Sequence, residues 1–348
     1  MPGISEKAPA AGETIASAAV PVRVGGRLVR PECVQTHESG VLFASDWTGT
    51  GGVAIVRPDG PVERLLARGC DFDLKPNGIA LEPGGSFLIA HLGVETGGMY
   101  RLCPDGTVEP RLTMLEGRLL PPSNFPLIDR QGRVWLTVST RIQPRSNDYR
   151  ASAATGLIIL IDRKGSRIVA DGLGYANECA LSADERYLFV NETYARRLSR
   201  FEVGRDGSLR RRTAVATFGR GEFPDGVVLD REGGLWITSI ISNRVIRIAT
   251  DGNRTLVVED ADPDHVDLVE EAFLADRLGR AHLDVAKGRL LSNISSLAFG
   301  GPSLKTAYLG SLLGTAIFSF EAQVAGLEPV HYRVGLGPLS QPRQSSIA

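Results

Sequence analysis

The chain has 348 residues, with 40 acidic residues against 39 lysines and arginines, so its formal net charge is −1. This balance excludes the basic footprint of a nucleic-acid-binding domain, and no apolar run reaches the ~20 residues that a membrane-spanning helix needs. The four cysteines form no Cys-x-x-Cys pair, which favours free thiols over disulfides or a zinc-thiolate site. We therefore expect a cytoplasmic protein without nucleic-acid or membrane partners.

The chain begins with residues 1–21, which lack the apolar core of a secretory signal and are predicted to form a flexible tail. Residues 22–29 are predicted to form a strand that helps to close the last repeat of a ring, because closure removes exposed sheet edges. A single domain is expected over residues 22–335, and residues 336–348 are expected to form a C-terminal tail.

Six similar segments follow one another within this domain. Each contains a hydrophobic strand, and successive strands start 46, 47, 53, 48 and 71 residues apart, by subtraction of the residue numbers given below. Periods of ~40–50 residues with several short strands are typical of β-propellers. The sequence therefore predicts an all-β, six-bladed β-propeller with a central metal site. A β-sandwich or two β domains are the alternatives, but no Pro/Gly/Ser-rich linker divides the chain. The predicted strands are Val41–Trp47, Phe87–Gly93, Val134–Thr140, Tyr187–Thr193, Leu235–Ile241 and Thr306–Leu312.

One polar residue precedes each of these strands by nine or ten positions. In a propeller these positions meet at one end of the central channel. Two carboxylates and three amides give an oxygen-rich set that suits a hard divalent cation. Calcium fits these ligand types best, and magnesium, manganese, zinc and ferrous iron remain open. The alternative is that the side chains only make turn hydrogen bonds. The six residues are Glu32, Asn77, Asn124, Asn177, Asp225 and Ser296.

Two long connections are predicted to lie at the same end of the channel. Residues 141–155 carry Arg141 and Tyr149, which we predict to contact substrate because arginine suits carboxylate groups; a solvated loop is the alternative. Residues 259–292 are acidic and have helical spacing within about 259–285, which favours a lid or a partner surface. An EF-hand is not supported, because His265 stands where the loop needs glycine.

Three further residues are candidates for substrate contacts near the predicted ring. His91 ends a hydrophobic strand, where it could act as a proton shuttle or serve a structural role. Asn77 is itself a ring position, and Glu178 directly follows another.

Several motifs resemble the senescence marker protein/gluconolactonase/luciferin-regenerating enzyme family. They are Glu32 after Pro31, the segment Tyr175–Ser182, the segment Phe223–Val227 and the segment Ile294–Gly301. The resemblance implies that one divalent cation is bound by Glu32, Asn124, Asn177 and Asp225, and that the protein is a metal-dependent hydrolase.

The chain departs from the family pattern at two places. Asn124 is followed by Phe125-Pro126 where the family commonly has Asp-Gly, and Glu178 stands where a glycine is usual. Both changes alter the channel wall, so the resemblance does not identify the substrate as that of gluconolactonase.

The leading hypothesis is a lactonase that opens a sugar-acid or other small lactone with metal-activated water. Asp225 would be the general base, with a direct nucleophilic role as the less favoured reading. Phosphotriesterase or lyase chemistry at the same site, and a non-enzymatic propeller that acts as a binding scaffold, are the alternatives. We expect a small-molecule substrate and a monomer or small homo-oligomer.

Overall fold

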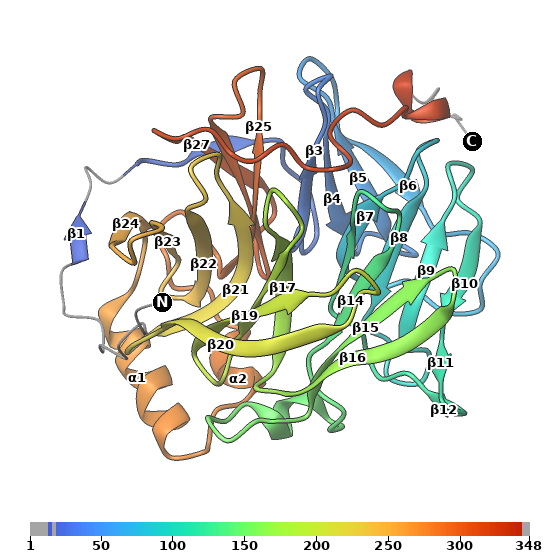
Figure 1. The fold of residues 1–348 in the computed structure, drawn as a ribbon. Helices are drawn as coiled ribbons and strands as arrows, with labels where there is room; N and C mark the ends of the chain where they lie inside the picture. The colour runs from blue at the N-terminus through green and yellow to red at the C-terminus, as the bar shows by residue number, and fades with distance from the viewer. Residues whose placement is uncertain (1–12, 16–18, 343–348) are drawn as a thin grey trace.

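The structure is a computed structural model that describes residues 13–15 and 19–342. Six sheets surround a central channel, five of four strands and one of five, which confirms the predicted six-bladed β-propeller (Figure 1). Neighbouring strands within each blade are antiparallel, and the first strand of each blade lies innermost.

The blades follow one another along the chain. The first is β3 (Val34–Thr36), β4 (Leu42–Asp46), β5 (Gly52–Val56) and β6 (Glu63–Leu66); the second is β7 (Pro76–Leu81), β8 (Phe87–His91), β9 (Gly98–Leu102) and β10 (Val108–Leu112). The third is β13 (Phe125–Ile128), β14 (Val134–Val138), β15 (Gly156–Asp162) and β16 (Gly165–Leu173); the fourth is β17 (Ala176–Leu181), β18 (Tyr187–Glu192), β19 (Arg197–Val203) and β20 (Leu209–Thr217). The fifth is β21 (Glu222–Leu229), β22 (Leu235–Ile241), β23 (Arg244–Ile248) and β24 (Arg254–Glu259); the sixth contains β25 (Ile294–Gly300), β26 (Thr306–Ser311) and β27 (Ile317–Glu321). The remaining elements are β1 (Glu13–Ile15), β2 (Val22–Val24), β11 (Met114–Leu115), β12 (Arg118–Leu119), α1 (Pro263–Leu274), α2 (Arg280–Leu283) and the 3₁₀ turns η1 (Arg145–Asp148) and η2 (Gly337–Ser340).

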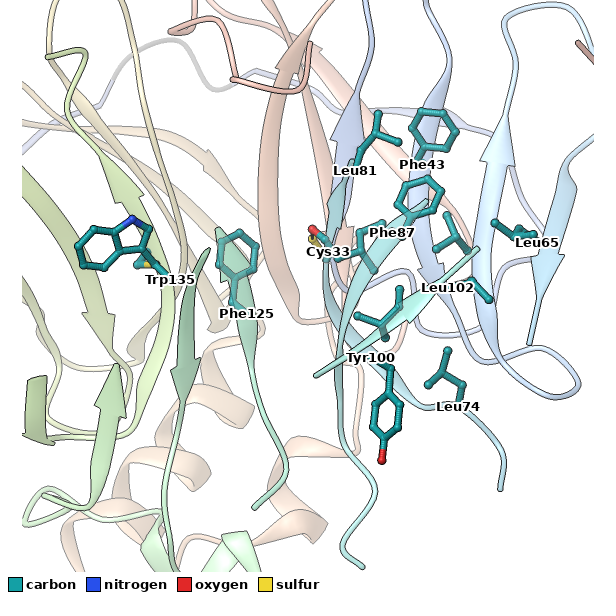
Figure 2. Close-up of a cluster of buried hydrophobic side chains, with 14 of the residues drawn as sticks. Cys33, Phe43, Leu65, Leu74, Leu81, Phe87, Tyr100, Leu102, Phe125 and Trp135 are labelled. Atoms are coloured by element: carbon teal, nitrogen blue, oxygen red, sulfur yellow. Dashed lines mark hydrogen bonds between the residues drawn. The ribbon is translucent and has the colours of Figure 1, made fainter. Parts of the chain in front are cut away.

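The second strand of each blade lies where the sequence predicts it, to within two residues at either end. Strands β8 and β22, for example, are buried at every position. A strand sandwiched between two neighbouring blades must be apolar on both faces, so it appears in the sequence as a continuous hydrophobic run rather than an alternating one. Figure 2 shows this packing between the first two blades, where the rings of Phe43 and Phe87 meet edge to face at 5.1 Å.

The last blade is completed by the beginning of the chain. Strand β2 pairs antiparallel with β27, with Val22 opposite Ser319 and Val24 opposite Ile317, as predicted for residues 22–29. This pairing ties the first and last blades of the ring together. Strand β1, within residues 1–21, adds to the outer edge of β24 in parallel; residues 1–12 and 16–18 of the predicted tail lie outside the described residues.

A C-terminal segment, residues 326–341, crosses one end of the channel, and we call it the strap. Its backbone is hydrogen-bonded to three blades: Leu327 N–H donates to Leu229 O (2.9 Å), Glu38 N–H donates to Tyr332 O (2.9 Å) and Gly84 N–H donates to Gly335 O (2.7 Å). Leu336 and Leu339 belong to the buried core cluster. In Figure 1 the strap runs along the upper side of the molecule, whereas α1 and α2 lie at the lower side.

The acidic insert forms the two helices. Asp262 caps α1 by accepting a hydrogen bond from the His265 backbone N–H at 2.9 Å, so the acidic start serves the helix, as predicted. Val266, Val269 and Phe273 are buried against the propeller, whereas Leu274, on the same predicted stripe, is 74% exposed. In the described part of the chain, no helix has the length and apolar character needed to cross a membrane.

Candidate metal centre and active site

The predicted ring residues lie at the starts of the inner strands, so the fold brings them to one end of the channel. Glu32 precedes β3 and Asn124 precedes β13, while Asn77, Asn177 and Asp225 are in β7, β17 and β21. All five are buried, with at most 5% of their surface exposed. This end faces α1 and α2, opposite the strap, and we call it the ring face.

Two asparagines present their amide oxygens without a hydrogen-bond partner. Asn124 Nδ2 donates to Ser139 Oγ at 3.0 Å, and Asn177 Nδ2 donates to Thr193 Oγ1 at 3.0 Å. Thr193 Oγ1 in turn donates to Pro224 O at 2.8 Å, so it can only accept from Asn177. Each amide nitrogen is therefore fixed, and both Oδ1 atoms are buried with no donor among the described residues. An unsatisfied buried acceptor costs about 1–3 kcal/mol, which a bound cation would offset.

Three carboxyl groups lie near these oxygens and influence one another. Burial, together with the charges of Glu32 and Glu178, raises the pKa of Asp225 well above its ordinary value. Burial and the charge of Glu32 likewise raise the pKa of Glu178. The site thus holds negative charge at a high energetic cost, which is typical of functional sites.

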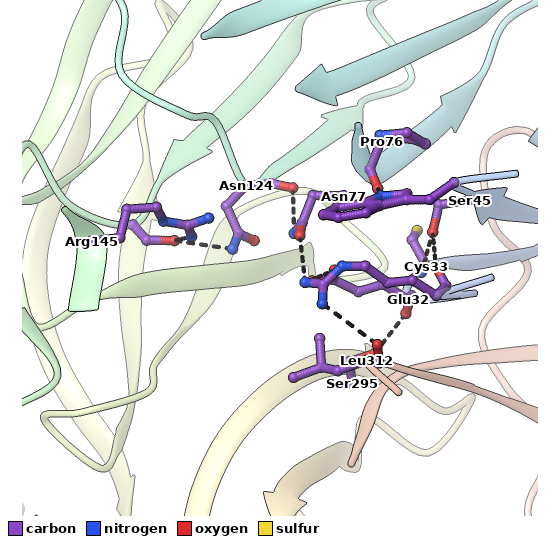
Figure 3. A network of polar contacts seen from close by, with 12 residues as sticks. Glu32, Cys33, Ser45, Pro76, Asn77, Asn124, Arg145, Ser295 and Leu312 are labelled. Carbon is purple, nitrogen blue, oxygen red and sulfur yellow. Dashed lines mark hydrogen bonds and ion pairs between the residues drawn. The ribbon is translucent and has the colours of Figure 1, made fainter. Parts of the chain in front are cut away.

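Arg30 supplies one compensating charge. Its Nη2 lies 2.6 Å from Glu32 Oε2, and its guanidinium stacks over the Trp47 ring at 4.8 Å. Figure 3 shows Glu32 together with the ring residues Asn77 and Asn124. The backbone at Arg30 adopts a positive φ of 56°, which turns the chain directly before Glu32. The sequence analysis did not identify Arg30.

The other two ring residues are engaged within the protein. Asn77 Nδ2 donates to Asn124 O at 3.1 Å, and Asn77 Oδ1 accepts from Arg30 Nη2 at 3.5 Å. Ser296 Oγ accepts from Val34 N–H at 3.2 Å. Asn77 therefore joins the second blade to the third, and Ser296 joins the sixth to the first.

The remaining donor set fits a hard cation. Glu32 and Asp225 offer carboxylate oxygens, and Asn124 and Asn177 offer the two unpaired amide oxygens. Over residues 13–15 and 19–342, no three His, Cys, Asp or Glu side chains converge in a way that could hold a metal ion. A cation held at this ring would therefore depend on the amides, which are ligands that calcium and magnesium accept and that soft metals disfavour.

The loop over residues 141–155 brings a different arginine to the ring than predicted. Arg145 Nη2 donates to Ser139 Oγ at 3.0 Å, and its guanidinium lies 5.5 Å from the centre of the Tyr175 ring. No carboxylate in the described residues lies within ion-pair distance of it, and its Nε is buried without a partner. Arg141 instead forms an exposed ion pair with Asp171 at 2.6 Å.

Two predicted substrate-contact residues have packing roles in the structure. Tyr149 is buried, with its ring 4.7 Å from that of Tyr194. His91 Nδ1 accepts from Lys75 N–H at 2.9 Å and its Nε2 lies 3.0 Å from Thr96 Oγ1. Burial, and then the charge of Lys75, lower the pKa of His91 to about 4.

The hydroxyls that orient the two amides were also missed, although the sequence carries a signal for them. Ser139 and Thr193 follow their asparagines by 15 and 16 residues, at the ends of second strands. Ser45 and Ser239 occupy similar places in other blades and accept backbone N–H groups from Cys33 and Phe223. A hydroxyl residue recurring at this place in four blades indicates a second polar shell around the ring.

The fold and the ring define the class of protein: a six-bladed β-propeller with buried carboxylates and unpaired amides at one end of its channel. A profile of the SMP-30/gluconolactonase/LRE-like region matches residues 31–261. The chain therefore belongs to this family.

Individual relatives are distant. The Arabidopsis thaliana protein strictosidine synthase-like 13 is 28% identical over 146 residues, which is 40% of this chain and 36% of that protein. The match thus spans well under half of that relative's length.

Solved structures of the same fold cover nearly all of the chain. A luciferin-regenerating enzyme gives a TM-score of 0.65 at 18% identity over 91% of this chain and 100% of its own. A gluconolactonase from Xanthomonas campestris gives 0.60 at 20% identity, over 90% and 98%. The calcium-binding protein regucalcin from Agrobacterium tumefaciens gives 0.61 at 17% identity, over 89% and 98%.

Proposed function

We propose that the protein is a metal-dependent lactonase that opens a small lactone at the ring face. The observation that carries the proposal is the pair of buried amide oxygens, Asn124 Oδ1 and Asn177 Oδ1, which lack donors beside Glu32 and Asp225. Family membership and the gluconolactonase among the solved structures support lactone hydrolysis, and the regucalcin supports calcium.

The proposal assigns four residues to the cation and one of these four to proton transfer. Glu32, Asn124, Asn177 and Asp225 would hold one divalent cation, which when bound supplies Lewis acidity toward a carbonyl group and activates water. Asp225 is the general base, because its carboxylate would lie beside both the cation and the water that the cation activates, so it can accept the proton that this water loses.

Arg145 favours an acidic or polyhydroxylated substrate. Its guanidinium has no carboxylate partner within the described residues and shares Ser139 Oγ with the amide of Asn124, so its free donors lie beside the ring. A planar guanidinium suits a carboxylate or adjacent hydroxyl groups. This favours a sugar-acid lactone over a purely apolar one.

The test pairs metal analysis with activity. Protein purified without added metal or chelator is expected to contain one equivalent of a divalent metal, and to open glucono-δ-lactone or a related lactone in a pH-stat assay. EDTA should abolish turnover, and calcium or the metal found should restore it. Asp225→Asn should lower turnover by at least ~10²-fold, the usual contribution of a general base.

A matched variant separates this effect from a general charge effect. Asp184→Asn changes an exposed turn aspartate that only bonds within its own turn and should leave turnover unchanged. Near-normal activity of Asp225→Asn would reject Asp225 as the base. Bound metal with turnover only of a phosphotriester would point to the related hydrolase chemistry, and neither metal nor turnover would favour a binding scaffold.

A further inference from the structure

The channel contains a second compartment on the strap side of the ring. A cavity of about 390 Å³ is lined by residues that directly follow the ring positions, among them Cys33, Phe125 and Glu178. It continues along the inner strands past Ala180 and Ala298 to the strap. Its volume lies within the ~300–1,000 Å³ typical of small-molecule sites. Ser296 is among the residues that line it, but the four proposed metal ligands are not.

The two departures from the family sequence pattern meet in this cavity. Phe125 and Pro126, which stand where the family commonly has Asp-Gly, both line it, and so does Glu178, which stands where the family has glycine. Figure 2 shows the Phe125 ring at the channel wall, on the side facing Cys33. Phe125 and Pro126 make this part of the wall apolar.

The far end of the cavity is bounded by the strap and by two turns. Leu327, Pro329, Val330 and Val334 of the strap line it. On the side of the third and fourth blades, the rim consists of turn residues, where Arg130 N–H donates to Glu185 Oε1 at 2.8 Å. The strap is hydrogen-bonded to blades five, one and two through the bonds described above, so the mouth lies toward blades three and four.

The walls carry little charge near neutral pH. His331, on the strap, has its pKa lowered to about 4 by burial and then by the charge of His37, so the imidazole is neutral. Glu185 accepts a hydrogen bond from the backbone N–H of Arg130. Two other lining carboxylates are in ion pairs: Glu328 with Arg333 at 2.9 Å, and Asp129 with Arg133 at 2.6 Å. A ligand carboxylate inside the cavity would lie near Glu178 and would find no cationic side chain among the inner-strand residues that line the walls.

The geometry points to a binding site for the hydrocarbon body of an uncharged small molecule in the strap-side channel. At ~30 Å³ for each water-sized group, the cavity holds a chain of roughly ten carbons. The molecule enters between the strap and the turns of blades three and four and leaves a neutral polar end, such as a hydroxyl, at the rim. The site is independent of the proposed lactonase activity, because it lies on the other side of the ring.

Primary alcohols test the proposal by isothermal titration calorimetry with the full-length protein. Affinity should rise about fourfold per methylene from 1-hexanol to 1-decanol, the increment expected for burying one methylene. Sodium decanoate, of equal length, should bind at least tenfold more weakly than 1-decanol. Treatment with EDTA should leave 1-decanol binding unchanged, which keeps this result separate from the fate of the lactonase proposal.

Cavity-filling variants locate the binding. Ala180→Leu and Ala298→Leu replace two cavity-lining alanines that are 9% and 8% exposed, and each should weaken 1-decanol binding at least tenfold. Both alanines also pack in buried clusters, so the melting temperature of each variant is measured to show that it is folded. Ala275→Leu, at the exposed end of α1, is the matched control and should bind as the wild type does. Wild-type affinity in whichever cavity variant folds, a flat chain-length series, or equal binding of decanoate would each overturn the proposal.

Discussion

The orientation of Asn177 gives a direct test of the ring, through the substitution Thr193→Val. Thr193 Oγ1 accepts from Asn177 Nδ2 at 3.0 Å and donates to Pro224 O at 2.8 Å. Valine keeps the shape of threonine and removes both hydrogen bonds. The amide of Asn177 then loses the partner that points its oxygen toward the ring.

The size of the effect follows from these contacts. Two buried groups, Asn177 Nδ2 and Pro224 O, lose a partner at about 1–3 kcal/mol each, so the free energy of unfolding should fall by about 2–6 kcal/mol. Loss of a group that orients a metal ligand commonly weakens metal affinity by about 10–100-fold. Calcium titration by calorimetry measures the affinity, and urea denaturation in EDTA measures the stability of the metal-free protein.

A second threonine provides the control for this experiment. Thr36 is buried, and its Oγ1 donates to Phe299 O at 2.6 Å, on the strap side of the channel. Thr36→Val should lower stability by a similar mechanism while leaving calcium affinity unchanged. Calcium binding by folded Thr193→Val with wild-type affinity would refute the argument that this hydroxyl orients a metal ligand.

Two further predictions concern stability. Glu192 is fully buried and pairs with Arg197 (2.7 Å) and Arg212 (2.6 Å). Glu192→Gln should lower the free energy of unfolding by about 3 kcal/mol, because it breaks two ion pairs whose carboxylate is fully buried. Burial alone would raise the pKa of Glu192, but its hydrogen bonds outweigh burial and lower the pKa. The stabilisation from Glu192 is therefore present above the unfolded pKa of ~4.5 and is lost as pH falls through the folded pKa. Below pH 4.5, the denaturation midpoint of Glu192→Gln should fall less steeply with decreasing pH than that of the wild type. The pKa of His331 is lowered to about 4 in the folded state, so the unfolded chain binds more protons than the folded chain between pH 6.5 and pH 4. The free energy of unfolding should therefore decrease by up to about 3 kcal/mol as pH falls across that window. His331→Phe should flatten this part of the plot of unfolding free energy against pH, and an unchanged slope would show that His331 is accessible to protons in the folded state.

The sequence predicts the blades well because their burial is encoded locally. A second strand such as Leu235–Ile241 is buried on both faces, so every residue must be apolar and the run is visible without knowledge of its neighbours. The ring residues were found for a similar reason. Each lies at a fixed offset from such a strand, and repetition makes the offset visible.

The features of the site that could not be predicted from the sequence depend on where side chains and loops point once the blades are assembled. Arg30 reaches Glu32 because its backbone has a positive φ, which no pattern in the sequence indicates. The choice of Arg145 rather than Arg141 as the ring arginine depends on how the loop folds, because both lie on the same predicted loop. The strap across the channel is likewise a long-range arrangement that its own composition does not reveal.

The use of amides at the ring has an electrostatic consequence for catalysis. With a cation bound, which favours ionised ligands, Glu32 and Asp225 bring two negative charges. Arg30 and Arg145 bring two positive charges, so these four groups sum to zero. Burial and the charge of Glu32 raise the pKa of Glu178, which limits its negative contribution. A divalent cation at the ring would therefore leave an excess of positive charge. In the proposed lactonase reaction, that excess would stabilise the negative charge that develops when a lactone carbonyl is attacked. Carboxylates in place of Asn124 and Asn177 would cancel this excess, so neutral ligands bind the cation less strongly but leave more of its charge available for the reaction.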